Sequence, residues 1–268
     1  KFNIPMGLGS QKIMIHDPKL RRLFDVKKVA PKVFLIGNIG AVSFNYSITL
    51  KNILQVIDDL ALDAFALHLN VLQECIQPEG EKNFARLLDK IGELVGLSPV
   101  PIVIKEVGAG IAPQTVKKLV GVGVKAIDVG GKGGTNWSLI EGLRADPLGN
   151  RLGKLFAHWG LTTEKSLELC VQALKQEKSS VSLIATGGIR NGLHIAKAIA
   201  MGATMAGVGL PIFKAAAMPP SEKLSSLEAV EQEMLFFQKS LAISMFCSGA
   251  QNLSQLKFRI LKGDLNVK

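Results

Sequence analysis

The sequence predicts an α/β fold, a (β/α)8 TIM barrel, from three observations. Short β-branched or apolar runs that end in Gly, Asn or Asp recur along the 268 residues, and stretches with helical periodicity separate them. The runs follow one another at the spacing of βαβ units, about 25 to 35 residues, and such units build parallel sheets. With 47% hydrophobic residues, the chain can also bury a large core.

Seven runs have the composition of buried strands. They are residues 4–9, 33–38, 64–70, 101–107, 124–129, 181–186 and 205–210. A TIM barrel needs eight strands, and we expect the first to lie before residue 1, which is Lys rather than Met. Residues 1–268 would then be a single TIM-barrel domain whose N-terminal part is missing. The alternative, an open doubly wound sheet, usually carries a GxGxxG turn after its first strand, and this sequence has none.

Helical signals fill the spaces between these runs. Asp17 and Pro18 have the residue types of an N-cap and a first turn. Apolar stripes predict helices over 50–60 and 84–95, and further helices are expected over 163–175, 191–200 and 225–246. Between residues 129 and 181 the sequence predicts one helix, 163–175, after a long Gly-rich loop that could cover a substrate.

Composition narrows the class of partner. The net charge of +10 favours an anionic ligand. One Tyr and two Trp are too few for base stacking, so we expect no nucleic-acid partner. No apolar run reaches the ~18 residues of a membrane span, and no signal segment opens the sequence. Three cysteines without CxxC spacing indicate neither a disulfide framework nor zinc. We therefore expect a cytoplasmic protein that does not bind membranes.

Polar side chains gather at the carboxyl ends of the predicted strands. Side chains alternate across a strand, so Ala66, His68 and Asn70 share one face, which we expect to look into the barrel. The polar strand ends are Ser10 and Gln11, Asn38, His68 and Asn70, Lys105 and Glu106, Asp128, and Thr186. Any one of them is compatible with a structural role, but together they predict a site at the barrel mouth, because buried polar groups without partners are costly.

Glycines follow the last two predicted strands. They lie in the segment Gly187–Arg190 and at Gly207 and Gly209, the latter followed by Leu210. Loops at this position of a barrel, with free backbone N–H groups and a helix N-terminus, bind phosphate. The alternative is that these glycines serve only as tight turns. A second Gly-rich loop, 132–135, could wrap a ribityl or phosphate chain.

Glu74 is a candidate metal ligand, in the segment His68–Glu74 at a strand end and the loop after it. It has no His or Cys neighbour at metal-ligand spacing, so we expect a single oxygen ligand to Mg²⁺, which one carboxylate and substrate phosphates commonly bind. An exposed loop glutamate is the alternative.

These motifs together resemble the type 2 isopentenyl diphosphate isomerases, FMN-dependent enzymes with a (β/α)8 barrel. The matching stretches are Met6–Gln11, Asn38–Gly40, His68–Glu74, Ile104–Gly108, Asp128–Trp137 and Ala185–Arg190. They span nearly the whole sequence in family order. The family's N-terminal Arg-Lys…His segment and its Met-Thr-Gly-Gly motif have no counterpart in this sequence.

The resemblance implies FMN, NADPH as reductant and Mg²⁺, with isopentenyl and dimethylallyl diphosphate as substrate and product in isoprenoid biosynthesis. It places the flavin against Ser10, Asn38, Lys105 and Thr135, and its phosphate against Gly188, Arg190, Gly209 and Leu210. Gln11, His68, Asn70 and Gln73 would contact the substrate, with Gln73 and His68 catalytic, and Glu74 would bind Mg²⁺. The family generally forms homo-oligomers, tetramers or octamers.

The reaction is a 1,3-proton shift, which needs an acid and a base in a site that excludes water. An amide is a poor acid, so we expect Gln73 to relay or position a proton. Two other classes share parts of the pattern. A 2-hydroxy-acid oxidase needs a His base beside a carboxylate-binding Arg, and the loop 128–137 contains neither residue. A non-catalytic phosphate-binding module would not need the polar mouth.

Overall fold

The computed structural model describes residues 2–217, 225–257 and 259. Its centre is a sheet of seven parallel strands whose spatial order follows the chain. The strands are β1 (Met6–Gly7), β2 (Leu35–Gly40), β3 (Ala64–Leu69), β4 (Ile102–Glu106), β5 (Ala126–Asp128), β6 (Ser182–Ala185) and β7 (Met205–Ala206). Each overlaps one predicted run. Because the strand order does not reverse, the doubly wound alternative is excluded.

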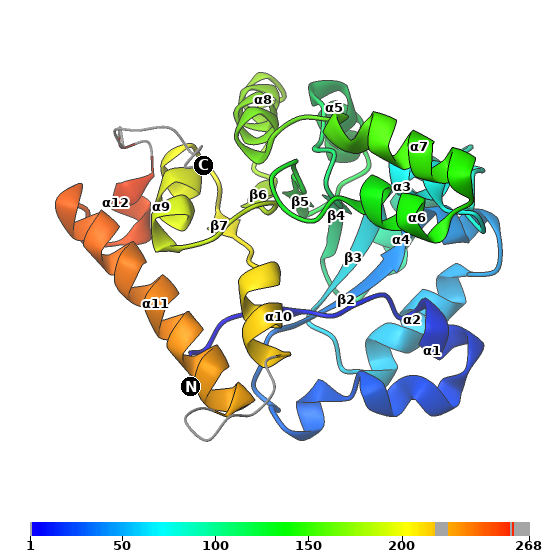
Figure 1. Cartoon of the computed structure of the whole chain (residues 1–268), viewed down its shortest axis with the longest axis horizontal. Coiled ribbons are helices and arrows are strands. Elements are labelled where there is room, and N and C mark those ends of the chain that lie inside the picture. Colours follow the sequence, from blue (N-terminus) through cyan, green and yellow to red (C-terminus); the bar gives the residue numbers. More distant parts are fainter. Residues whose placement is uncertain (1, 218–224, 258, 260–268) are drawn as a thin grey trace.

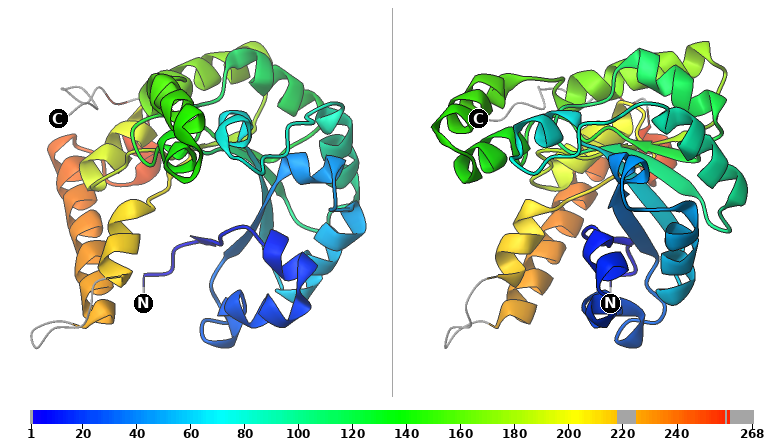
Figure 2. Two further views of the ribbon diagram at one scale, coloured as in Figure 1. Left: turned by 45° about the vertical axis from the view of Figure 1, so that its right-hand side comes forward. Right: turned by 90° about the vertical axis from the view of Figure 1, so that its right-hand side faces the viewer.

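The sheet curls into part of a barrel, with helices on its outer side (Figure 1, Figure 2). Within the described residues, β1 pairs only with β2 and β7 only with β6. The structure therefore shows a seven-stranded partial barrel where the sequence predicted seven strands of a closed eight-stranded one. In a parallel sheet the carboxyl ends of all the strands lie along one edge. In barrels this edge is where functional sites lie.

Helices connect successive strands. The α-helices are α1 (Lys12–His16), α2 (Leu50–Asp59), α3 (Val71–Ile76), α4 (Leu87–Leu97), α5 (Pro113–Gly121), α6 (Trp137–Arg144), α7 (Pro147–Leu155), α8 (Thr163–Gln176), α9 (Gly192–Ala200), α10 (Leu210–Ala216), α11 (Ser226–Cys247) and α12 (Leu253–Leu256). The described residues also form four 3-10 helices, η1 (Pro18–Leu23), η2 (Val26–Lys28), η3 (Ala41–Asn45) and η4 (Phe156–His158). Asp17 caps η1 by accepting the Lys19 N–H, as its position predicted.

The segment between β5 and β6 differs from the prediction. It holds three α-helices, α6, α7 and α8, where the sequence indicated α8 alone. Helices α6 and α7 form a pair that packs through glycines: a Cβ on Gly142 would lie 3.0 Å from the Gly153 Cα. Each is under ten residues long, too short to show a sustained apolar stripe. Similarly, Gln73 and Glu74 lie on the short helix α3 and not on a loop.

The two faces of the sheet have different side chains. Phe65, Leu67 and Ile104 are fully buried between the sheet and its helices. The inner face carries a separate cluster of smaller residues, Ala64, Ala66 and Val103 among them. This confirms the predicted alternation along β3. Within the described residues, no helix is long and apolar enough to cross a membrane.

Candidate active site at the carboxyl ends of the strands

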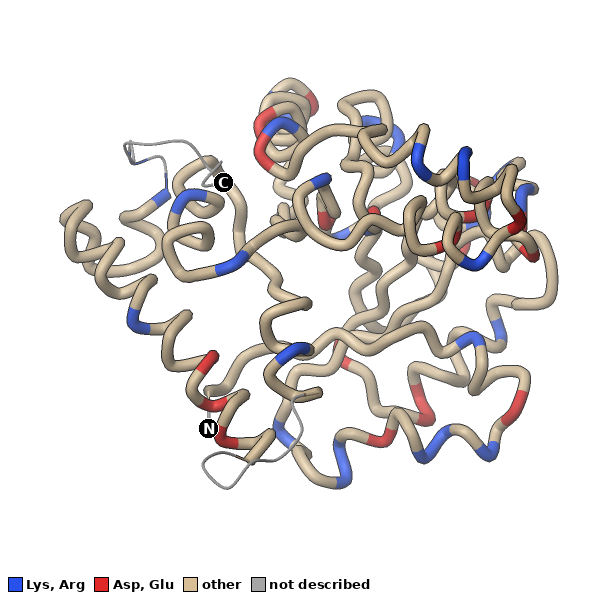
Figure 3. Tube along the Cα trace, viewed as in Figure 1, with Lys and Arg blue, Asp and Glu red and all other residues tan. Residues whose placement is uncertain are grey.

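A row of polar side chains crosses the sheet near its carboxyl edge. In the strand register, His68 of β3 pairs with Lys105 of β4, and Lys105 pairs with Asp128 of β5. Elsewhere, charged residues are spread over the surrounding helices and loops (Figure 3). Within the strands they are Lys105, Glu106 and Asp128, all at this edge. Parallel pairing therefore brings residues 60 positions apart in sequence into one row, the "polar row" of His68, Lys105 and Asp128.

His68 is held as a neutral imidazole. Its Nδ1 lies 2.9 Å from the Asn38 Oδ1, so Nδ1 carries the proton in that bond. Burial, together with the nearby cations Lys105 and Lys12, lowers the pKa of His68 to about 3. The ring fits because Gly40 opposite has no side chain: a Cβ there would lie 3.1 Å from Nε2. A neutral His68 offers Nε2 as an acceptor at the mouth.

Lys105 and Asp128 are the charged members of the row. The Lys105 Nζ donates to the Glu106 carbonyl at 2.8 Å. Asp128 is 6% exposed, and its Oδ1 accepts from the Thr186 hydroxyl at 2.6 Å and from the Gly130 N–H at 3.2 Å. Burial raises the pKa of Asp128, while the Lys105 charge and the Thr186 hydrogen bond oppose the rise.

Glu106 is a buried carboxylate in a nest of backbone donors. Its Oε2 accepts N–H groups from the three residues of the following loop, Val107, Gly108 and Ala109, at 2.6 to 2.8 Å. Burial raises the pKa of Glu106 above its usual value, and these hydrogen bonds offset only part of the rise. Its role here is to shape the loop after β4.

Ser10 and Gln11 follow β1 directly. Gln11 is fully buried, and its Oε1 accepts the Asn38 N–H at 2.6 Å while its Nε2 donates to the Gly9 carbonyl. Its amide thus fastens the end of β1 to β2. Ser10 is half-buried, and its hydroxyl accepts the Lys12 N–H at 3.3 Å. Gln11 thus contacts Asn38 and, through it, His68.

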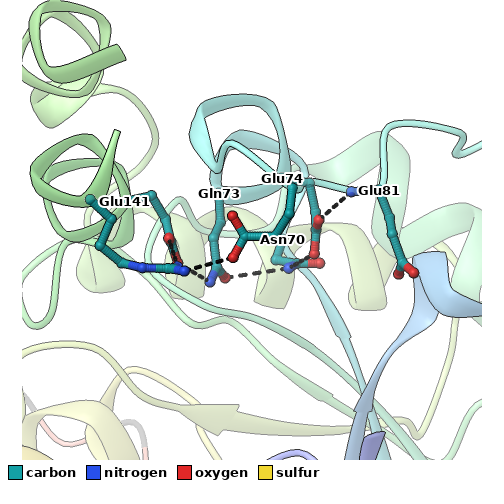
Figure 4. Close-up of polar contacts among 7 residues, drawn as sticks. Asn70, Gln73, Glu74, Glu81 and Glu141 are labelled. Carbon is teal, nitrogen blue, oxygen red and sulfur yellow. Dashed lines mark hydrogen bonds and ion pairs between the residues drawn. The ribbon is translucent and has the colours of Figure 1, made fainter. Parts of the chain in front are cut away.

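Asn70, Gln73 and Glu74 form a hydrogen-bonded cluster at the end of β3 (Figure 4). The Asn70 Nδ2 donates to Glu74 Oε1 at 2.7 Å and to Gln73 Oε1 at 3.3 Å. The Asn70 Oδ1 is buried and finds no hydrogen-bond partner among the described residues. A buried acceptor without a donor is costly, so this oxygen fits a role toward a bound ligand.

Glu141 and Arg144 of α6 join this cluster, and the sequence did not indicate them. The Gln73 Nε2 donates to Glu141 Oε1 at 2.8 Å, and Glu141 Oε2 pairs with Arg144 at 2.5 Å. Glu141 is 3% exposed, so its charge is shielded from water. It lies 68 positions from Gln73, and no local spacing could have joined them; only the unpredicted helix α6 brings it here.

Glu74 offers one carboxylate to a cation. Its Oε2 accepts the Glu81 N–H (Figure 4), at a distance of 2.6 Å. Glu74 is 9% exposed and lies in a short helix. The alternative of an exposed loop glutamate is therefore wrong. In the described residues no group of three or more His, Cys, Asp or Glu side chains could hold a metal ion. The donor set fits Mg²⁺ only as one carboxylate that completes a shell of phosphate oxygens and water.

The two Gly-rich loops pack against each other. Gly187 and Gly188 have φ of +102° and +80°, and a Cβ on Gly188 would lie 2.5 Å from the Gly133 carbonyl oxygen. The positive φ angles and this close approach explain why both positions are glycine, and no ligand is needed for that explanation. Thr135 is exposed at the end of the same Gly133 loop. The tight-turn interpretation thus accounts for the residue type at Gly187 and Gly188.

Gly209 is different, because no atom lies within 4 Å of the position its Cβ would take. It is the N-cap of α10, and Leu210 begins that helix. Arg190 and Leu210 line a surface cavity of about 620 Å³, together with residues of α10 and α11. Open space beside a guanidinium and unpaired first-turn N–H groups suits a phosphate, so these residues fit the FMN phosphate.

Comparison with known proteins identifies the family of the chain. The profile of the FMN-dependent dehydrogenase family matches residues 42–262, which defines the class as flavin-dependent enzymes. An isopentenyl-diphosphate delta-isomerase from Nostoc sp. is 42% identical over 257 residues, 96% of this chain and 70% of the relative. Those from Synechococcus sp. and Rickettsia bellii are each 43% identical over 96% of this chain and cover 71% and 72% of the relatives. The chain belongs to the FMN-dependent family of isopentenyl-diphosphate delta-isomerases.

Proposed function

We propose that this chain interconverts isopentenyl and dimethylallyl diphosphate by a 1,3-allylic proton shift with reduced FMN, as a step of isoprenoid biosynthesis. The observation that carries the proposal is the Asn70–Gln73–Glu141 cluster beside the polar row, in a chain whose relatives are isomerases. It joins an unpaired acceptor, an oriented amide and a shielded carboxylate at one point of the mouth.

The residues at the mouth fit FMN in two groups. Ser10, Asn38, Lys105 and Thr135 would surround the flavin ring, and Gly188, Arg190, Gly209 and Leu210 would hold the phosphate. The cavity beside Arg190 and the open space at Gly209 support the second group. When bound, reduced FMN supplies an electron-rich ring and a nitrogen that exchanges a proton beside the alkene.

Gln73 and Glu141 would handle the proton on the protein side. The Glu141 carboxylate accepts from the Gln73 Nε2, so it fixes which end of the amide faces the substrate. Arg144 holds Glu141 in turn. Gln73 Oε1 thereby stays an acceptor, for the Asn70 Nδ2 in this structure and, in the proposal, for a proton near the reacting carbons, while Glu141 is the carboxylate that this amide contacts. We infer that Gln73 positions the proton and that Glu141 orients Gln73.

The substrate would lie between the polar row and α3. His68, Asn70 and Gln11 would contact it, with the neutral His68 Nε2 and the unpaired Asn70 Oδ1 as acceptors. The aromatic residues Trp137, Phe156 and Trp159 line a small cavity of about 30 Å³ beside Gln73 and would help to keep water from a tertiary carbocation. Glu74 would bind Mg²⁺ together with the diphosphate.

The resemblance extends the proposal to NADPH as the reductant, a single TIM-barrel domain, a homo-oligomer (tetramer or octamer) and a cytoplasmic location. An apolar strip on α11 supports self-association: Phe236, Ile243 and Phe246 are 52%, 63% and 86% exposed. We expect neither nucleic acid nor membrane as a partner.

The test follows isopentenyl diphosphate in D₂O by NMR, with FMN-loaded protein reduced by NADPH. Isomerisation and deuterium uptake without stoichiometric NADPH use are expected, and they also separate an isomerase from an oxidase. Gln73→Ala should lower kcat by about 100-fold or more, within the range for a group that transfers protons, while FMN binding persists. The control is Gln172→Ala, an exposed residue on α8. Full turnover by Gln73→Ala would refute the role of this amide.

A further inference from the structure

Asp128 has no part in the mechanism above, although it lies within the polar row. It is the register partner of Lys105 on the neighbouring parallel strand, so the two side chains leave the same face of the sheet side by side. On its other side Lys105 is paired with the neutral His68. The ammonium of Lys105 therefore has a carboxylate as one strand neighbour and an uncharged ring as the other.

The groups around Asp128 act against the rise that burial causes in its pKa. Two donors, the Thr186 hydroxyl and the Gly130 N–H, point at the same oxygen, Oδ1. Hydrogen bonds and a neighbouring cation favour the ionised form of a buried carboxylate. With 6% of its surface exposed, that charge is poorly screened by water and acts over several ångströms.

We propose that Asp128 is a positioning residue that sets the reduction potential of bound FMN through Lys105. The inference rests on the proposed function, in which Lys105 contacts the flavin. Reduction adds two electrons and one proton to FMN and leaves an anion on the ring. Lys105 stabilises that anion, and Asp128 cancels part of the Lys105 charge. The carboxylate thus lowers the potential and keeps the reduced ring electron-rich.

The test is the midpoint potential of the FMN-loaded protein, measured by titration with dithionite as the electron donor. Asp128→Asn keeps the shape and an acceptor for Thr186 but removes the charge. We expect the equilibrium ratio of reduced to oxidised FMN to rise about tenfold, which for a two-electron couple is a rise of about 30 mV in the midpoint potential. Asp63→Asn is the matched control, because Asp63 also pairs with a lysine, Lys27, and a backbone N–H, but at the opposite end of β3. It should leave the potential unchanged.

A double-mutant cycle tests the route through Lys105. In a Lys105→Met background, Asp128→Asn should change the reduced-to-oxidised preference by less than about threefold, because the charge that Asp128 acts on is gone. An equal effect of Asp128→Asn with and without Lys105 would contradict the proposed route. A potential that stays at the wild-type value in Asp128→Asn would overturn the proposal itself.

Thr186→Val keeps the test decisive if Asp128→Asn does not fold. It removes one of the donors that lower the pKa of Asp128, so it favours the neutral acid and the potential should rise, in the same direction as in Asp128→Asn. An unchanged potential in Thr186→Val would then refute the proposal. Failure of the proposed function is distinguishable, because in that case the wild-type protein would bind no FMN or would not isomerise isopentenyl diphosphate.

Discussion

The two faces of the sheet use the same strands for different purposes. On β3, Phe65 and Leu67 point outward into the large cluster under the helices, while Ala66 and His68 point inward toward the mouth. The outer face is filled by large apolar side chains, and the inner face has small residues below and charged or polar ones at its edge. The outer face therefore carries most of the stability, and the inner face leaves room and charge for ligands.

The largest expected effect is on the outer face. Leu67→Ala should lower the free energy of unfolding by about 3 kcal/mol, because it leaves a cavity in a fully buried cluster. Urea unfolding measures this loss. FMN affinity of the folded protein should stay within about twofold, since a contact on the far face of the sheet adds little at the mouth. Leu143→Ala, at a site 75% exposed, is the control and should cost almost nothing. A large change in FMN affinity would break the division between the faces.

The glycines at the mouth should divide in the same way. Gly188→Ala forces a positive φ and a contact with the Gly133 carbonyl, so a loss of about 2 kcal/mol of stability is expected. Gly209→Ala meets no atom and should leave stability unchanged. If the FMN phosphate lies beside Gly209, the Gly209→Ala substitution should weaken FMN binding about tenfold, a change of about 1.4 kcal/mol in binding free energy. Flavin fluorescence titration and thermal melts separate the two results, and unweakened binding in Gly209→Ala would move the phosphate elsewhere.

The inner face should make stability depend on pH. His68 has a pKa of about 3 in the folded protein against 6.5 for the free side chain. Below pH 6.5 the His68 side chain binds a proton in the unfolded chain but stays neutral in the folded one. The contribution of His68 to the free energy of unfolding is therefore complete above pH 6.5 and is lost as the pH falls toward 3. The loss should reach a few kcal/mol by the slope for a single site. His68→Asn should flatten the unfolding profile over this range. An identical slope in both proteins would show that His68 titrates normally.

The smallest effect is on thiol reactivity. Cys170 of α8 belongs to the outer-face cluster, and burial raises its pKa to about 11. Cys75 and Cys247 are exposed. A thiol reagent should modify the two exposed cysteines in the native protein and Cys170 only on unfolding, because the thiolate is the reacting form. Fast modification of all three would show that the outer face opens readily.

Much of the fold could be predicted because periodicity is local. Each strand run and the long helices α2, α8 and α11 are set by residues within one segment. The pair α6 and α7 could not be predicted, because short helices that pack through Gly142 and Gly153 have a weak apolar pattern. The resemblance to the isomerases could also be recognised from the sequence, because each matching motif is a short contiguous stretch.

The sequence by itself determined the parallel α/β architecture, the inward face of residues 64–70 and the polar residues that end the strands, since these follow from the order of residues along one segment. Only the tertiary structure decided which of those residues meet. The contact of Gln73 with Glu141 and the placing of Lys105 between His68 and Asp128 depend on strand register and on how α6 folds over the mouth. Such contacts join residues tens of positions apart, and packing of the whole sheet sets them rather than any local pattern.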